Sequence, residues 1–370
     1  MSISGLISII PAILTAFFIC FIMMPMIIRV AEIKHLIDQP DQKRKFHGSL
    51  IPTFGGIGIF AAFIISFSIW GGGNELSTYP YFVASLFLLF LVGIRDDLIV
   101  LEPMQKLIVQ FLAAIVLVTG GGLVLTDFGG ILGFHEVPWI AGVIFSVIVL
   151  VAIINAFNLI DGIDGLAGGI GVIISSIFGI WFWGVGFISL AVLAFSLAGA
   201  LIGFLIFNMN PAKIFMGDTG AMAVGFILGY LALEYIILNS AIAGQPWHMA
   251  NGQIFALALF VIPVTDTLRV MVIRLVNKKS ILVADRNHIH HKLSETGMSD
   301  QFVSFSLWLA NILIVGVMYS ISYLHANIQL ILLIIAGFFI LPLIRYIYTS
   351  GLRFVIERNE KKSQAALDIH

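Results

Sequence analysis

The stretch WIAGVIFSVIVLVAIINAFNLIDGIDG, residues 139–165, contains the features that decide the fold. Residues 139–158 are almost entirely apolar, and an α-helix needs about 20 such residues to cross the hydrocarbon core of a bilayer. Polar side chains then recur at every third position, at Asn155, Asn158, Asp161 and Asp164. We therefore predict a membrane-spanning helix that ends in a polar site.

The composition of the whole chain has the same character. Of the 370 residues, 60% are hydrophobic and 11% are charged, with a mean hydropathy of +1.07. Soluble domains carry about 25% charged residues, so the chain is predicted to be an integral membrane protein. Its net charge of −1 argues against a nucleic-acid partner. The single cysteine, Cys20, lies in an apolar run and excludes an intramolecular disulfide.

Hydropathy and length predict eleven membrane spans, and the fold class is an all-α polytopic bundle. The first span has no basic segment before it and no convincing cleavage site, so we expect a retained span and not a signal peptide. The predicted spans are 4–28, 52–70, 79–94, 105–125, 139–158, 165–183, 187–207, 219–239, 252–273, 302–323 and 327–349.

The basic residues predict the orientation of these spans. All 19 lysines and arginines fall on one side, and the opposite connections contain none: 71–78, 126–138, 184–186, 240–251 and 324–326. Cytoplasmic loops are enriched in Lys and Arg, so the N-terminus is expected outside and the C-terminus in the cytoplasm. Residues 1–349 form the predicted membrane domain, and residues 350–370 form a cytoplasmic tail. The outer segment 125–138 has the alternation of a short β-hairpin.

The segment Gly93–Asp97 ends an apolar helix with two adjacent carboxylates, Asp96 and Asp97. Negative charge at a helix C-terminus opposes the helix dipole unless a cation or proton offsets it. A solvated cap is one interpretation, and a base or Mg²⁺ site is the other. Lys106, which begins the next span, is placed to reach a phosphate.

Two further polar segments lie at predicted inner helix ends. In 155–164, helix–helix hydrogen bonding explains Asn155 but not two carboxylates, which indicate a site. In 208–220, Lys213 and Phe215 suit a phosphate and an aromatic base, and Asp218 is predicted at the N-cap of the following span. A capping role and a metal-binding role for Asp218 are compatible.

The longest predicted inner loop contains the segment DRNHIHHK, residues 285–292. Its histidines and flanking cations suit a diphosphate, whereas zinc sites want three or four ligands and the loop offers no cysteine. A solvated basic loop is the third interpretation. Elsewhere, Asp266 is expected to pair with Arg269 or Arg274 and not to take part in catalysis.

Taken in order along the chain, these motifs resemble the polyprenyl-phosphate N-acetylhexosamine-1-phosphate transferase family. The resemblance rests on PTFGG (52–56), the Asp96–Asp97 pair, NAFNLIDGIDGL (155–166), FMGDTG (215–220) and HIHH (288–291). The last loop is similar to that of the WecA/TagO-like branch, which uses UDP-N-acetylglucosamine (UDP-GlcNAc). The branch that takes a muramoyl-pentapeptide nucleotide typically has three consecutive histidines there.

The resemblance implies transfer of a sugar-1-phosphate from a UDP-sugar to undecaprenyl phosphate, with release of UMP, at a cytoplasmic cleft of a bacterial inner-membrane protein. It implies Mg²⁺, or Mn²⁺, at Asn158 and Asp218. Asp96 matches the carboxylate that accepts a proton from the lipid phosphate or, in a double-displacement scheme, attacks directly, and Asp97 would support the metal or the base. The substrate-binding residues that it implies are Lys106, Asp161, Asp164, Phe215, Arg286, His288, His290 and His291.

Two other classes of protein share some of these features. A sugar-nucleotide or anion transporter also has intramembrane polar groups, but its site is expected near the bilayer midplane and within repeats. A structural scaffold would not need the acidic clusters. The expected partners are the UDP-sugar, undecaprenyl phosphate and the bilayer, and a homodimer is compatible with the sequence.

Overall fold

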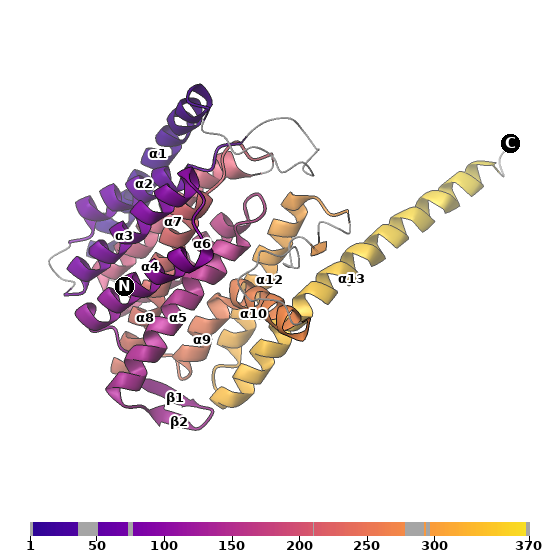
Figure 1. Ribbon diagram of the computed structural model, residues 1–370. Coiled ribbons are helices and arrows are strands. Elements are labelled where there is room, and N and C mark those ends of the chain that lie inside the picture. The colour runs from indigo at the N-terminus through magenta and orange to yellow at the C-terminus, as the bar shows by residue number, and fades with distance from the viewer. Residues whose placement is uncertain are drawn as a thin grey trace.

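The structure is a computed structural model that describes residues 3–35, 51–72, 77–209, 211–277, 292–293 and 297–367. These residues form a bundle of helices with one small β-hairpin (Figure 1). The first helices are α1 (Ile3–Ile33), α2 (Gly55–Trp70), α3 (Tyr79–Leu98), α4 (Pro103–Ile115) with the π-helical turn η1 (Val116–Gly120), and α5 (Trp139–Ile160). They are followed by α6 (Leu166–Val185), α7 (Ile188–Asn208), α8 (Gly217–Ala241), α9 (Gly252–Leu259), α10 (Val261–Val276), α12 (Asp300–Ser320) and α13 (Ala326–Leu367).

Each of the eleven predicted spans coincides with a helix or with a broken pair of helices. Within the described ranges, eight helices are long and apolar enough to cross a membrane, or nine if the pair α9 and α10 forms one span. This pair is bent by 76°, whereas the sequence predicted one span over 252–273. The apolar helix α2 has 16 residues and falls short of a full crossing by length. The count of eleven crossings therefore stays a prediction.

Helix α8 lies in the core of the bundle. Of the most apolar 18-residue window of α8, 83% is buried, compared with 22% for α1 and for α13. Such burial suits a helix that is apolar on all sides and rich in small residues, because glycine and alanine let neighbouring backbones approach closely. The main neighbours of α8 are α2, α3, α5, α6 and α9. The first turn of α8 lies beside the last turn of α3 and the end of α5.

The hairpin lies at the opposite end of α5 from the predicted polar site. Strand β1 (Asp127–Ile131) pairs with the antiparallel strand β2 (Phe134–Glu136), which leads into the N-terminus of α5. The Asp127 carboxylate accepts a hydrogen bond from the Ser240 hydroxyl at 2.9 Å, and the Leu132 N–H donates to the Asn327 side chain at 2.7 Å. The hairpin therefore ties the starts of α5 and α13 to the end of α8.

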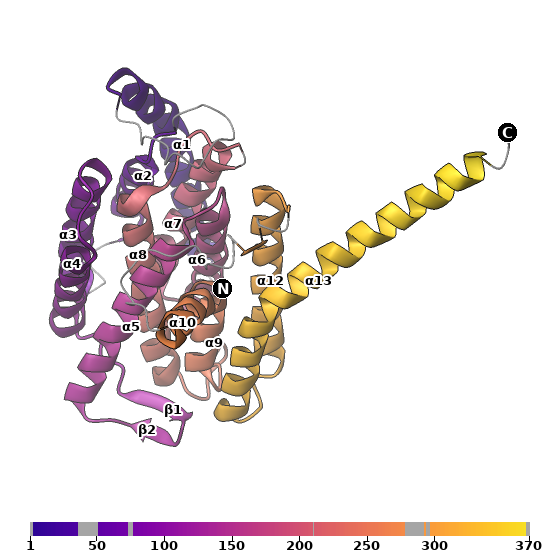
Figure 2. The same cartoon turned by 45° about the vertical axis from the view of Figure 1, so that its right-hand side comes forward.

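The last helix continues beyond the bundle. Figures 1 and 2 show α13 projecting away from the other helices along its C-terminal part. Its backbone is helical from Ala326 to Leu367 and passes without a break through position 350, where the cytoplasmic tail is predicted to begin.

Candidate active site

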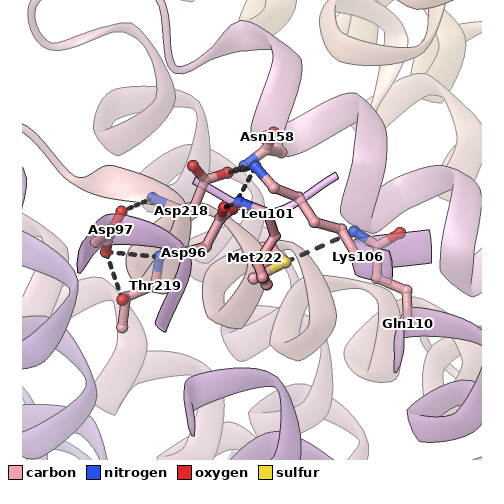
Figure 3. A network of polar contacts seen from close by, with 9 residues as sticks. All are labelled: Asp96, Asp97, Leu101, Lys106, Gln110, Asn158, Asp218, Thr219 and Met222. Carbon is pink, nitrogen blue, oxygen red and sulfur yellow. Dashed lines mark hydrogen bonds and ion pairs between the residues drawn. The ribbon is translucent and has the colours of Figure 1, made fainter. Parts of the chain in front are cut away.

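The ends of four helices bring predicted site residues into one polar network. Asp96 and Asp97 come from the last turn of α3, Lys106 from the start of α4, Asn158 from the end of α5, and Asp218 from the first turn of α8 (Figure 3). These positions are separated by as many as 122 residues in sequence. Five of the predicted site residues are thus neighbours in space.

Lys106 joins two carboxylates of this network. Its Nζ forms an ion pair with Asp96 Oδ2 and lies 3.2 Å from Asp218 Oδ1. The Asp96 side chain is 1% exposed, whereas that of Lys106 is 23% exposed. The second oxygen of Asp96 accepts a hydrogen bond from the Leu101 N–H at 2.7 Å. Both oxygens of Asp96 therefore have a partner, and Lys106 is the more accessible member of the pair.

The Asp97 carboxylate contacts the first turn of α8. It accepts hydrogen bonds from the Asp218 N–H at 2.7 Å, the Thr219 N–H at 3.1 Å and the Thr219 hydroxyl at 2.5 Å. The first N–H groups of a helix have no partner within the helix, so a carboxylate there satisfies them. The predicted N-cap role of Asp218 is wrong, because Met216 occupies the cap position and Asp218 is the second residue of the helix.

Asn158 and Asp218 lie close enough to share a ligand. The Asn158 Nδ2 donates a hydrogen bond to Asp218 Oδ1 at 2.7 Å, and a half-turn of the amide about its axis would present its oxygen instead. In the part of the chain that the structure describes, no group of three or more His, Cys, Asp or Glu side chains could hold a metal. Magnesium commonly uses one or two carboxylates and completes its shell with substrate phosphates. The Asn158–Asp218 pair fits that kind of site.

Asp161 follows α5 and lies in the electrostatic field of the same site. Burial and the charges of Asp218, Asp97 and Asp164 together raise the pKa of its carboxyl to about 7, and a hydrogen bond from the Gly217 backbone opposes the rise. A divalent cation among these carboxylates would oppose that rise. The excess of negative charge is a second observation that fits a metal site here.

Asp164 and Asn208 connect the turn after α5 to the segment before α8. Asp164 Oδ2 accepts a hydrogen bond from the Ala212 N–H at 2.9 Å. Asn208 accepts from the Gly165 N–H and donates to the Ile214 carbonyl, both at 2.9 Å. Asp164 thus makes a structural contact, and its predicted role in substrate binding stays a prediction.

Phe215 belongs to a short stretch of backbone pairing with the segment before α2. Its N–H donates to the Pro52 carbonyl at 2.8 Å, and its carbonyl accepts from the Gly55 N–H at 2.9 Å. The side chain of Phe215 is half-buried. The PTFGG segment thereby holds the loop that leads into Asp218, whereas stacking of Phe215 on uracil stays a prediction.

Three functional candidates were not identified from sequence: Thr219, Gln110 and the partner role of Asn208. Gln110 lies one turn after Lys106 on α4 and accepts a hydrogen bond from the Asn155 amide on α5. Its own amide lies 3.6 Å from the sulfur of Met222, one turn after Asp218 on α8. For Gln110, the signal that was available is its i, i+4 spacing from Lys106. Asn155 therefore makes the helix–helix hydrogen bond that its position suggested.

Arg286, His288, His290 and His291 lie outside the described residues. Asp266, by contrast, is buried and pairs with Arg269 at 3.4 Å, as expected from the sequence.

Comparison with known proteins places the network in a protein family. A model described as Glycosyl transferase family 4 matches residues 79–236, which include the whole network. "Probable undecaprenyl-phosphate N-acetylglucosaminyl 1-phosphate transferase" of Bacillus subtilis (strain 168) is 30% identical over 86% of this chain and 84% of its own. "Undecaprenyl-phosphate alpha-N-acetylglucosaminyl 1-phosphate transferase" is 32% identical in Yersinia pestis, over 76% of each chain, and 30% identical in Escherichia coli (strain K12), over 84% of each.

The fold and the network define a membrane protein with an acidic polar site at the ends of its helices. The extent and identity of these matches show more: the chain belongs to glycosyl transferase family 4.

Proposed function

We propose that the protein transfers N-acetylglucosamine-1-phosphate from UDP-GlcNAc to undecaprenyl phosphate and releases UMP, as the first membrane step in making a cell-envelope polysaccharide. The observation that carries this proposal is the position of Lys106 between Asp96 and Asp218, with Asn158 beside Asp218. A cation and metal-type oxygen ligands at the ends of membrane helices suit a reaction between two phosphates. One of these is anchored in the bilayer.

The proposed reaction is a displacement at phosphorus. An oxygen of the lipid phosphate forms a bond to the β-phosphorus of UDP-GlcNAc. The bond from that phosphorus to the bridging oxygen breaks, and UMP leaves with the oxygen. Phosphoryl transfer depends mainly on positioning and charge stabilisation, so the contribution of the protein is to place the two anions and to balance their charge.

Asn158 and Asp218 would hold Mg²⁺, with Mn²⁺ as an alternative. The ion would neutralise the diphosphate and stabilise the leaving UMP. Asp161 lies close enough to Asp218 for their charges to interact and would complete the acidic wall of the site.

Lys106 and Asp96 are proposed to act in sequence on the lipid phosphate. Because Lys106 is more exposed than Asp96, an entering phosphate meets the ammonium group first. Transfer of Lys106 from Asp96 to the phosphate frees Asp96 Oδ2, which then accepts the proton that a monoanionic lipid phosphate carries. The second pKa of a phosphate is about 6, so this proton matters most at and below neutral pH.

Product formation by purified protein tests the proposal. Detergent-solubilised protein with undecaprenyl phosphate, Mg²⁺ and radiolabelled UDP-GlcNAc is expected to yield labelled lipid and UMP. EDTA and the variant Asp218→Asn should each abolish turnover, while the melting temperature of the variant stays close to that of the wild type. Full activity in excess EDTA would contradict the metal site, and preference for a muramoyl-pentapeptide nucleotide would contradict the donor.

A further inference from the structure

We infer that Asp97 is a positioning residue, with Thr219 as its partner, that fixes the first turn of α8 and thereby sets the place of Asp218. The inference rests on the proposed function, because Asp218 is the residue whose place matters for that reaction. It differs from the role that the resemblance implied for Asp97, which was to support the metal or the base.

The hydrogen bonds of Asp97 support this assignment. Asp97 Oδ1 accepts from the Asp218 N–H, and Oδ2 accepts from both the N–H and the hydroxyl of Thr219. Figure 3 shows the carboxylate directed at the start of α8 and away from Lys106. Both oxygens are thus engaged by groups in the first turn of α8.

The backbone around Asp97 is shaped for this contact. Gly217 has φ +72°, and a Cβ there would lie 2.0 Å from the Thr53 carbonyl and 2.8 Å from Asp97 Oδ1. On the other helix, a Cβ at Gly93 would lie 2.4 Å from the Thr219 Cα. Gly93 therefore lets α3 approach the backbone of α8, and Gly217 leaves room for the Asp97 carboxylate.

This arrangement also resolves the electrostatic cost of the acidic pair. A carboxylate at the C-terminus of α3 is disfavoured by the dipole of that helix, but the N-terminus of α8 attracts negative charge. The charge of Asp97 is therefore stabilised by the N-terminus of α8, although the residue lies on α3. Because the residue whose N–H it holds is Asp218, a shift of Asp97 moves the Asp218 carboxylate relative to Lys106 and Asn158.

Thr219 gives a test that leaves every proposed substrate contact in place. Thr219→Val removes the hydroxyl at nearly constant shape, and Thr219→Ser, the matched control, keeps it. A hydrogen bond to a charged group contributes enough that we expect kcat to fall about tenfold or more in Thr219→Val, with KM for UDP-GlcNAc within about twofold of wild type. Thr219→Ser should recover most of the loss. The inference would be overturned if Thr219→Val kept the kcat of the wild type while Asp97→Asn was inactive.

The pH profile and a double variant complete the test. If Asp97 acts through Thr219, Asp97→Asn should be the more damaging single change. Adding Thr219→Val to Asp97→Asn should then lower kcat little further. The kcat of Asp97→Asn should keep the wild-type dependence on pH. If the acid limb of the kcat–pH profile is lost in Asp97→Asn but kept in Thr219→Val, Asp97 acts as a base and the inference is overturned. If the wild type makes no lipid product, the proposed function fails. The contact between Asp97 and Thr219 is then tested by the melting temperatures of the two single variants and the double variant. If the fall in melting temperature of the double variant equals the sum of the falls in the single variants, the inference is overturned.

Discussion

At the scale of single residues, the site combines a nearly inaccessible carboxylate with a more accessible cation. Asp96 keeps 1% of its side-chain surface exposed and depends on Lys106 and the Leu101 N–H for its partners. Removing one member of a buried ion pair leaves the other charge without compensation. Lys106 consequently has two proposed roles. It stabilises Asp96 in the resting protein, and it binds phosphate during turnover.

Lys106→Met is expected to lower both stability and turnover. Breaking a buried pair costs about 3 kcal/mol or more, and the partial exposure of Lys106 places the expected loss at the lower end. The melting temperature should fall by several degrees, and kcat should fall at least about a hundredfold if phosphate binding is also lost. Lys106→Arg keeps the charge and should retain the stability. Turnover near that of the wild type in Lys106→Met would contradict both roles.

Asp161 should make the stability of the metal-free protein depend on pH. Its carboxyl pKa is raised to about 7 by burial and by neighbouring Asp218, Asp97 and Asp164, so between its ordinary pKa and about 7 the folded protein binds a proton that the unfolded chain releases. The contribution of this group to stability is therefore present at low pH and is lost as the pH rises toward 7.

In EDTA, the melting temperature of the wild type should fall more between pH 5 and pH 8 than that of Asp161→Asn, and Mg²⁺ should reduce this difference. Equal pH dependence in the two proteins would contradict the raised pKa.

The sequence identified the chemistry of the site better than its contacts. The resemblance of the motifs to a transferase family implied one site for Asp96, Lys106, Asn158 and Asp218, and the structure brings all four together. Thr219 was missed because a threonine beside a catalytic-type aspartate gives no signal of its own. Its partner, Asp97, is 122 residues away in sequence, and a single sequence does not show which helix ends meet.

At the scale of helices, close contact between backbones fixes the position of α8. A Cβ at Gly56 on α2 would lie 2.2 Å from the Gly220 N–H nitrogen on α8. Gly316 on α12, by contrast, has nothing within 4 Å of an added Cβ. Replacement by alanine should therefore have different consequences at the two glycines.

Gly56→Ala is expected to separate α2 from α8 and to lower the melting temperature by several degrees, because overpacking of a close contact costs about 1–3 kcal/mol. Turnover should fall with it, since α8 carries Asp218. Gly316→Ala should leave both unchanged or raise stability slightly, because alanine favours the helix. Equal melting temperatures for the two variants would show that the α2–α8 contact does not constrain α8.

Helix positions followed from hydropathy, whereas helix ends and bends did not. The break between α9 and α10 falls within an apolar run, where hydropathy is uniform and gives no sign of a 76° change in direction. The start of α8 was misplaced because the cap is supplied from another helix, by Asp97. Local capping patterns cannot predict a cap that comes from a distant segment.

At the scale of the whole molecule, the distribution of charge predicts which face of the bundle lies in the cytoplasm. Cys20 is the single cysteine of the sequence, so a Cys20→Ala background makes labelling of introduced cysteines specific. In intact spheroplasts, a membrane-impermeant maleimide should label Gln245→Cys, an exposed position between α8 and α9, and not Lys213→Cys, an exposed position between α7 and α8. Permeabilised cells should label both. The reverse pattern would contradict the predicted orientation.

The fate of the β-phosphorus tests the central claim most directly. UDP-GlcNAc labelled both at its β-phosphorus and in its sugar is given to the purified protein with undecaprenyl phosphate and Mg²⁺. Transfer of the sugar-1-phosphate predicts that both labels enter the lipid in equal amounts and that unlabelled UMP is released in the same amount. Release of UDP carrying the phosphorus label, with the sugar alone on the lipid, would contradict the account, as would the absence of any labelled lipid.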